Sequence, residues 1–300
     1  MALGHYLGIV IVYNMLVILW GALVRATGSG AGCGSHWPLC NGQVLPEISS
    51  IQTQIEFAHR VSSGLSLPLV LIAGVWVFRK FPKGTWIRVP AMVACISILA
   101  EALIGAGLVL FELVSHDQSL KRVISICLHF TNTLVLIGSL VLVATSSFRA
   151  GKGWKWSTSK YRRPALLFVG LFFLVGIAGA VTALGDTLFP AQSLAHGFQQ
   201  DLNPASHFLI KLRVIHPILA LVFAGLAGPW VYSLLNRNSA ANFRKISKGL
   251  LILLFLNIGV GLLNLIWLAP LGLQLFHLCL ALTIWIVWVV TLDKLLTDAT

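Results

Sequence analysis

Charged side chains are scarce in this sequence, and acidic ones are the scarcest. Only 10% of the 300 residues are charged, whereas 57% are hydrophobic, and 9 Asp and Glu stand against 21 Lys and Arg. The apolar residues come in runs of about twenty, the length that crosses about 30 Å of hydrocarbon. The composition therefore predicts an integral membrane protein whose surroundings are the lipid bilayer.

Eight apolar runs divide the chain, and each is long enough for one membrane-spanning helix. This pattern predicts an all-α integral membrane fold with eight transmembrane helices. The predicted spans are residues 7–27, 56–78, 89–111, 123–145, 165–184, 209–235, 249–268 and 271–292.

Two connections contain no lysine or arginine, namely residues 28–55 and 185–208. The connections after the second, fourth and sixth spans are rich in both. The positive-inside rule therefore predicts a multi-pass protein of the cytoplasmic (cell) membrane, with both termini cytoplasmic and the two connections without lysine or arginine outside. Because the basic residues orient helices, the net charge of +12 does not predict nucleic-acid binding. No cleavable signal peptide is expected, because the first run ends in Arg25 and a glycine-rich stretch.

The two halves of the chain resemble each other. Gly21-Ala-Leu-Val-Arg-Ala-Thr-Gly matches Gly179-Ala-Val-Thr-Ala-Leu-Gly, and Ile104-Gly-Ala-Gly-Leu matches Ile258-Gly-Val-Gly-Leu. A parallel repeat of four spans predicts two tandem, pseudo-symmetric four-helix bundles. The predicted domains are an N-terminal bundle at 1–148, a basic cytoplasmic linker at 149–164 and a C-terminal bundle at 165–300.

Four histidines, His59, His129, His216 and His277, lie one or two turns inside the even-numbered spans. An imidazole within a membrane span is costly unless it binds a ligand or pairs, so each is a candidate functional residue. Even-numbered spans of an antiparallel bundle run in the same direction, which places the four side chains near the outer membrane face. Each predicted bundle thus contains two histidines.

A pair of histidines favours haem over zinc. Zinc usually takes a third or fourth protein ligand, whereas haem needs only axial ligands and a wide apolar slot between helices. Small residues open such slots. We expect close helix approach at glycines in both halves, namely Gly64, Gly105, Gly107, Gly138, Gly225, Gly259 and Gly261.

The halves differ beside the first histidine of each pair. Glu56 precedes His59 by three residues and lies on the same helical face, whereas Arg213 occupies that place before His216. An arginine there is suited to a haem propionate. Glu56 is predicted to be the only carboxylate beside a ligand histidine and is the candidate catalytic residue; its alternative role is an ion pair with Arg60 one turn later.

Cys33 and Cys40 lie in the predicted outer connection, in a compartment that permits disulfides. A disulfide between them is favoured over two free thiols. The remaining cysteines lie inside predicted spans and are expected to be small apolar filler. They are Cys95, Cys127 and Cys279.

An ordered set of motifs resembles the haem A synthase family over essentially the whole chain. The motifs are Gly21-Ala-Leu-Val-Arg-Ala-Thr-Gly-Ser-Gly, Trp37-Pro-Leu-Cys40, Glu56-Phe-Ala-His59-Arg60, Leu128-His129-Phe130, Gly185-Asp-Thr-Leu-Phe-Pro190, Leu212-Arg-Val-Ile-His216-Pro217 and Phe276-His277-Leu278.

The resemblance implies an oxidoreductase that converts a methyl group of haem O to the formyl group of haem A through a hydroxylated intermediate, in support of terminal oxidase assembly. It implies that His59 and His129 hold the substrate haem, and that His216 and His277 are the axial iron ligands of a bound haem B. It also implies haem O synthase as a partner and an electron acceptor or donor that the sequence does not identify. Contacts to the propionates or to the ligand histidines are expected from Arg25, Arg60 and Arg213. The cysteine pair matches the family members with an outer-loop disulfide.

Two other classes of protein fit part of the pattern. A dihaem electron-transfer protein of cytochrome b type also uses four histidines on paired helices, but keeps both haems and has no use for Glu56. A transporter often contains repeats, but its binding site lies near the membrane midplane.

Overall fold

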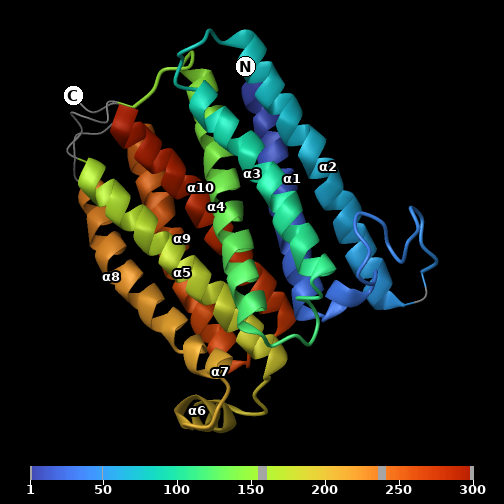
Figure 1. Ribbon diagram of the computed structural model, residues 1–300. Helices are drawn as coiled ribbons and strands as arrows, with labels where there is room; N and C mark the ends of the chain where they lie inside the picture. Colours follow the sequence, from blue (N-terminus) through green and yellow to red (C-terminus); the bar gives the residue numbers. More distant parts are fainter. Residues whose placement is uncertain (1, 49, 155–160, 236–240, 298–300) are drawn as a thin grey trace.

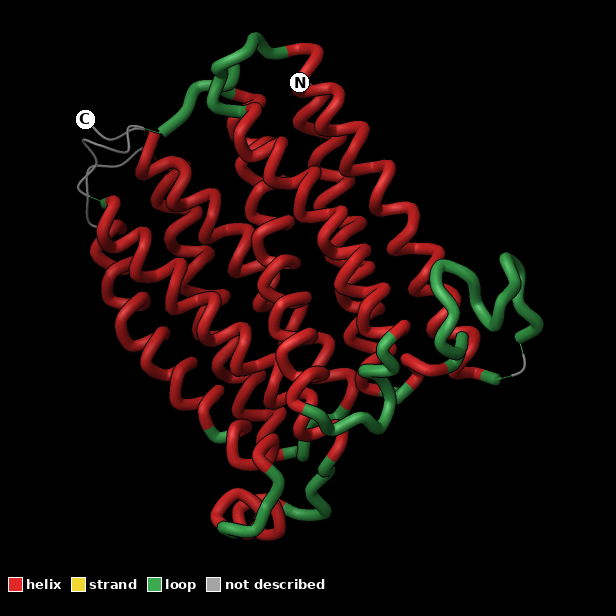
Figure 2. Tube along the Cα trace, viewed as in Figure 1, coloured by secondary structure: helices red, strands yellow, loops and turns green. Residues whose placement is uncertain are grey.

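The computed structural model describes residues 2–48, 50–154, 161–235 and 241–297. Throughout these residues the regular secondary structure is helical (Figures 1 and 2). Eight helical segments in this part of the chain are long and apolar enough to cross a membrane. The predicted all-α fold with eight transmembrane helices is therefore confirmed, and the chain is a multi-pass membrane protein.

The transmembrane helices extend a few residues beyond most of the predicted spans. Two short elements in the connections predicted to lie outside were not predicted: a 3-10 turn, η1, at Ser29–Ala31 and helix α6 at Leu194–Leu202. The membrane-length elements are α1 Ala2–Ala26, α2 Ile51–Lys80, α3 Arg88–Leu110, α4 Leu120–Phe148, α5 Arg162–Leu188, the pair α7 Phe208–Arg213 and α8 Ile215–Leu235, α9 Ala241–Ile266 and α10 Leu271–Thr297.

The sixth span is broken at Val214, between α7 and α8. Pro217 has no backbone N–H, so it cannot bond to the carbonyl of Arg213 four residues earlier. That carbonyl instead accepts a hydrogen bond from the Thr182 hydroxyl of α5, at 3.2 Å. The break places His216 in the first turn of α8, whereas His59 lies within the unbroken helix α2.

The helices form two rings of four. In the first, α1 and α3 each pack against α2 and α4; in the second, α5 and α9 each pack against α8 and α10. The rings meet where α1 and α4 contact α5 and α10, and Figure 1 shows the helices of the two rings. One apolar core continues across this seam. The division into domains remains a prediction, and residues 155–160 of the predicted linker lie outside the described residues.

Aromatic side chains fill the second bundle on the far side of its histidines. Rings from α5, α8 and α10 pack with centroid separations of 4.9–6.5 Å. On α10, Trp285 and Trp288 lie two to three turns beyond His277, so this cluster forms a floor beneath the histidine pair. The cluster consists of Phe168, Phe172, Phe223, Trp230, Trp285 and Trp288.

A buried ion pair joins the two bundles at the opposite end from the histidines. Asp293 of α10, with no exposed surface, accepts hydrogen bonds from both terminal nitrogens of Arg149 at 2.5 and 3.0 Å. It also accepts one from the Trp154 indole at 2.8 Å. Since Arg149 and Trp154 follow α4, this contact fixes the end of the first bundle to the last helix of the second.

Candidate functional site

The four predicted histidines lie near the beginnings of four helices that run in the same direction. His59 is in α2, His129 in α4, His216 in α8 and His277 in α10, and all four are half-buried. The expectation that they share one end of the molecule is therefore met. Which membrane face this end occupies remains a prediction.

Each histidine ring packs against a glycine on a neighbouring odd-numbered transmembrane helix. A Cβ atom built on three of these glycines would lie 3.0–3.2 Å from the imidazole and would crowd the ring, whereas at Gly105 it would be in ordinary contact at 3.9 Å. The pairs are Gly21 with His59, Gly105 with His129, Gly179 with His216, and Gly261 with His277. The repeated arrangement confirms the predicted helix approach at Gly105 and Gly261, whereas Gly64, Gly225 and Gly259 face open space.

The two histidines of each bundle face the same interior space. The ring centroids of His216 and His277 are 6.1 Å apart, with the ring planes nearly perpendicular. Because a metal–imidazole nitrogen bond is about 2.0–2.1 Å long, one metal ion fits between two rings at this separation. His59 and His129 are close enough to interact electrostatically. The His216–His277 pair thus matches the donor set of a metal with two imidazole ligands.

In each bundle, one of the two histidines has an oxygen atom near its Nδ1. His216 Nδ1 lies 3.1 Å from the Val175 carbonyl oxygen, and His129 Nδ1 lies 3.2 Å from Glu101 Oε2. In the described structure Nδ1 of His59, of His129 and of His277 makes no aligned hydrogen bond, whereas Nδ1 of His216 makes one. A metal ligand that uses Nε2 normally donates its other N–H to a partner. His216 has such a partner, and His129 has a carboxylate oxygen within hydrogen-bonding distance.

Glu101 is a polar residue of this site that the sequence analysis missed. It lies in α3, 17% of its side chain is exposed, and it contacts His129. The expectation that Glu56 is the only carboxylate beside a ligand histidine is therefore wrong. A signal was present in the sequence, since Glu101 is the one acidic residue of Arg88–Leu110 and an acidic residue within a membrane span marks a functional candidate.

Glu56 holds the loop between α1 and α2 against α2. Its carboxylate is 3% exposed, accepts hydrogen bonds from Arg60 at 2.5 and 3.1 Å, and accepts another from the Cys33 backbone N–H at 2.8 Å. Arg60 also donates to the backbone carbonyls of His36 and Leu39. The pairing of Glu56 with Arg60, considered from the sequence as its alternative role, is thus present.

The predicted disulfide between Cys33 and Cys40 is confirmed. Both cysteines belong to the loop that Glu56 and Arg60 hold, and both are buried. Thr53 also holds this loop, by donating a hydrogen bond to the Gly32 carbonyl at 2.8 Å. The loop therefore forms a fixed cover at the beginning of α2. The free cysteines in the spans are half-buried, as expected of filler.

Arg25 and Arg213 are occupied by protein groups. Arg25 donates to the Ala183 carbonyl at 2.5 Å, to Thr187 at 2.6 Å and to Gln274 at 3.1 Å, and so joins α1 to the second bundle. Arg213 pairs with Asp201 at 2.6 Å and lies 3.5 Å from Asp186. Its predicted contact with a propionate stays a prediction, because its hydrogen bonds here go to Asp201, to Gln200 and to the backbone carbonyls of Phe189 and Gly197.

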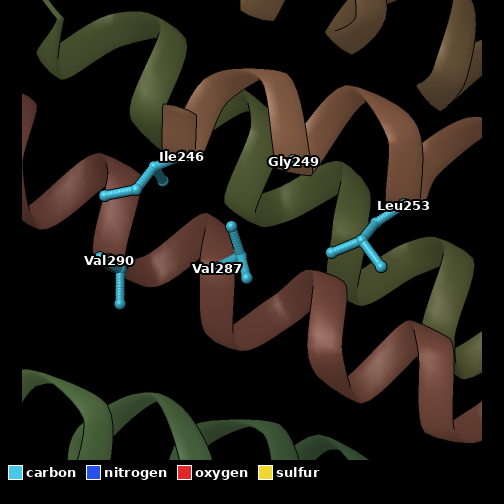
Figure 3. Close-up of a pocket in the computed structure, with 5 residues that line it drawn as sticks. All are labelled: Ile246, Gly249, Leu253, Val287 and Val290. Carbon is cyan, nitrogen blue, oxygen red and sulfur yellow. The ribbon is translucent and has the colours of Figure 1, made fainter. Parts of the chain in front are cut away.

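One hollow, between helices α9 and α10, lies away from the histidines. Figure 3 shows Ile246, Gly249 and Leu253 of α9 facing Val287 and Val290 of α10. The lining offers no titratable group. In the described part of the chain, no cluster of three or more His, Cys, Asp or Glu is arranged to hold a metal ion. The paired histidines are therefore the strongest candidate for a cofactor site.

Comparison with known proteins identifies the family. The model of a family described as cytochrome oxidase assembly protein matches residues 4–289. The chain belongs to this family.

Individual relatives in this family have two kinds of name. A protein of Thermus thermophilus named protoheme IX farnesyltransferase is 40% identical over 295 residues, which cover 96% of this chain and 47% of that protein. Heme A synthases are 38% identical in Halalkalibacterium halodurans (46% of this chain, 44% of the relative) and 29% identical in Exiguobacterium sibiricum (69% and 66%). The chain spans about half the length of the first of these relatives.

Proposed function

We propose that this membrane protein is a haem A synthase, which oxidises a methyl group of haem O to a formyl group through a hydroxylated intermediate and so supports terminal oxidase assembly. The observation that carries this proposal is the repeated arrangement of a histidine pair in each bundle. It is supported by the family and by the heme A synthases among the relatives.

In this proposal the two bundles have different tasks. His216 and His277 hold a resident haem B, for which their 6.1 Å separation is suitable. His59 and His129 hold the substrate haem O. The resident haem supplies electron transfer, while the surrounding residues bind, orient and exclude water.

Glu56 is proposed as the group that accepts a proton or orients water during oxidation of the methyl group. Its carboxylate lies one turn before His59 and is covered by the disulfide loop, which limits access of bulk water. Arg60 keeps a positive charge 2.5 Å from this carboxylate. Arg25, Arg60 and Arg213 are proposed contacts of the haem propionates or of the ligand histidines, for which each must exchange some of its present partners.

The proposed partner is a haem O synthase, because farnesylated haem is the substrate. The Thermus relative supports this partnership, since a segment similar to this chain is joined there to further sequence under the name of a farnesyltransferase. That name describes a protein about twice as long as the aligned segment, so it does not assign prenyl transfer to this chain.

The proposed orientation places both termini in the cytoplasm and the histidine sites toward the outer face of the cell membrane. Val44 is 75% exposed in the first outer loop, and Lys83 is exposed in the connection between α2 and α3. A membrane-impermeant maleimide added to intact cells should label Val44→Cys and spare Lys83→Cys. The reverse pattern would invert the topology.

Co-expression with a supply of haem O, followed by mass analysis of extracted porphyrins, tests the proposed function. Haem A or its hydroxylated intermediate alongside haem B is the expected result. Haem B alone at two per chain would favour the dihaem electron-transfer alternative.

A further inference from the structure

Glu101 is the only acidic residue of α3, and the proposed reaction gives it no task. Its side chain is largely buried within a membrane-spanning helix. A carboxylate in such a position is costly unless several donors surround it. The identity of those donors indicates what Glu101 does.

All the polar partners of Glu101 come from one stretch of α4. Asn132 donates to Oε2 at 2.6 Å, and the Thr133 hydroxyl donates to Oε1. His129 Nδ1 lies 3.2 Å from Oε2. Asn132 and Thr133 suffice to join α3 to α4, so the contact with His129 is additional to an anchor between the helices.

The contact with His129 is close in distance but is not aligned as a hydrogen bond. Nδ1 lies within hydrogen-bonding distance of the carboxylate, yet it makes no hydrogen bond that satisfies the angular requirement. In the proposal below, the ring turns so that this N–H points at Oε2. With Nδ1 facing Glu101, Nε2 is the nitrogen left to bind a metal.

The second bundle has an uncharged residue at the corresponding place. The glycines that contact the second histidine of each pair are Gly105 and Gly261, and four residues before them lie Glu101 and Asn257. The histidine contacts thus pair Gly105 with Gly261, whereas alignment of the two Ile-Gly-x-Gly motifs pairs Gly105 with Gly259, two residues earlier. Nδ1 of His216 lies next to a neutral group, the Val175 backbone carbonyl. Of the four histidines, His129 is the one that contacts a carboxylate.

We propose that Glu101 is a positioning residue that fixes His129 through Nδ1 and makes its Nε2 a stronger donor to the iron of the haem held in the first bundle. This inference rests on the proposed placement of a haem between His59 and His129. A carboxylate behind a ligand imidazole increases its basicity and orients the ring. The nearby negative charge also favours ferric over ferrous iron, so the first haem is easier to oxidise than it would be with a neutral partner.

The test compares Glu101→Gln with Thr133→Val in a chain that also carries His216→Ala and His277→Ala, so that one haem site remains. Glu101→Gln removes the charge and keeps the size, whereas Thr133→Val removes a bond between α3 and α4 and keeps the charge. Ferric haem B is the probe. Its affinity is measured from the absorption spectrum, and its midpoint potential by redox titration.

We expect Glu101→Gln to weaken haem binding about 10–100-fold. At a fixed potential it should lower the ratio of ferric to ferrous haem about tenfold, which is about 59 mV for one electron. Thr133→Val should leave the potential unchanged. In the full chain, Asn257→Asp should shift the second haem in the opposite direction, which gives a test in a protein that keeps all four histidines.

The proposal would be overturned if Glu101→Gln changed neither the haem affinity nor the ratio of ferric to ferrous haem at a fixed potential by more than twofold. Glu101 would then be an anchor between helices. An equal shift of the potential in Thr133→Val would do the same. A haem whose potential depends on Glu101, in a chain that makes no haem A, would instead contradict the proposed function alone. Binding that persists after His59→Ala and His129→Ala would contradict the haem site itself.

Discussion

The two bundles share a frame and differ in the polar groups placed around it. In both, each histidine on an even-numbered transmembrane helix packs against a glycine on an odd-numbered one. In the first bundle the residues nearest this frame include two carboxylates, Glu56 and Glu101, whereas the second has a backbone carbonyl beside His216 and an aromatic floor. The repeat provides two places for a haem, and the added side chains give each place its own chemistry.

The covers of the two bundles also differ. The loop over the first is closed by the Cys33–Cys40 disulfide and held by Glu56 and Arg60. The connection over the second contains helix α6 and is held by Arg213 through Asp201. An arginine near the first histidine of each pair therefore fastens the cover in both halves, but only the first cover engages a carboxylate of the candidate site.

Glu56→Gln is the change with the largest expected effect on this comparison. It keeps an oxygen for the Cys33 N–H but removes the charge and the proton acceptor. We expect haem O or its hydroxylated intermediate to accumulate, with haem A formation slowed about a hundredfold or more, by analogy with removal of a general base. Porphyrin analysis measures the rate, and haem B content reports folding.

Thr53→Val is the matched control for Glu56→Gln, because it loosens the same loop by removing the hydrogen bond to the Gly32 carbonyl without touching the carboxylate. It should retain most activity. Near wild-type haem A production by Glu56→Gln would return Glu56 to the role of an ion-pair partner of Arg60.

Asp293→Ala tests whether the bundles depend on each other for stability. Removing one partner of a buried ion pair leaves the other charge uncompensated, which costs about 3–5 kcal/mol. We expect a lower thermal unfolding midpoint in detergent and loss of haem from both bundles together. Lys294→Ala, the adjacent charged position, is the control. Unchanged unfolding in Asp293→Ala would show that this ion pair is not needed to hold the bundles together.

The disulfide should matter less. Cys33→Ser removes a cross-link around a short loop, for which a loss of about 2–3 kcal/mol is expected. The first bundle should lose stability and part of its activity while the second keeps its haem B. Complete inactivation of a chain that still folds and binds both haems would point to redox chemistry of the thiols.

Gly179→Ala should have the smallest effect, confined to the second bundle. Its new Cβ would lie 3.0 Å from the His216 ring, so the ring must shift by a few tenths of an ångström. Haem B occupancy should fall severalfold, as measured per mole of purified protein, while Gly170→Ala, where the new Cβ meets open space, keeps full occupancy. Equal occupancy in the two variants would show that the histidine pair tolerates displacement.

The sequence predicted those features that depend on local pattern. Runs of apolar residues located eight spans, the alternating direction of those spans placed four histidines at one end, and the compartment of the outer loop indicated the Cys33–Cys40 disulfide. Glu101 was missed because its contact with His129 joins residues on two different helices, and it depends on how α3 is rotated against α4. The partners of Arg213 were missed for a similar reason. Asp201 contacts Arg213 from α6, a short helix that no long apolar run predicts.

The most direct test of the division between the bundles is the haem content of two double variants purified after co-expression with haem O synthase. With His59→Ala and His129→Ala, the chain should keep about one haem B and yield neither haem O nor haem A. With His216→Ala and His277→Ala, it should lose haem B and keep haem O. Equal loss of haem B from both double variants would contradict the division into a substrate bundle and a cofactor bundle.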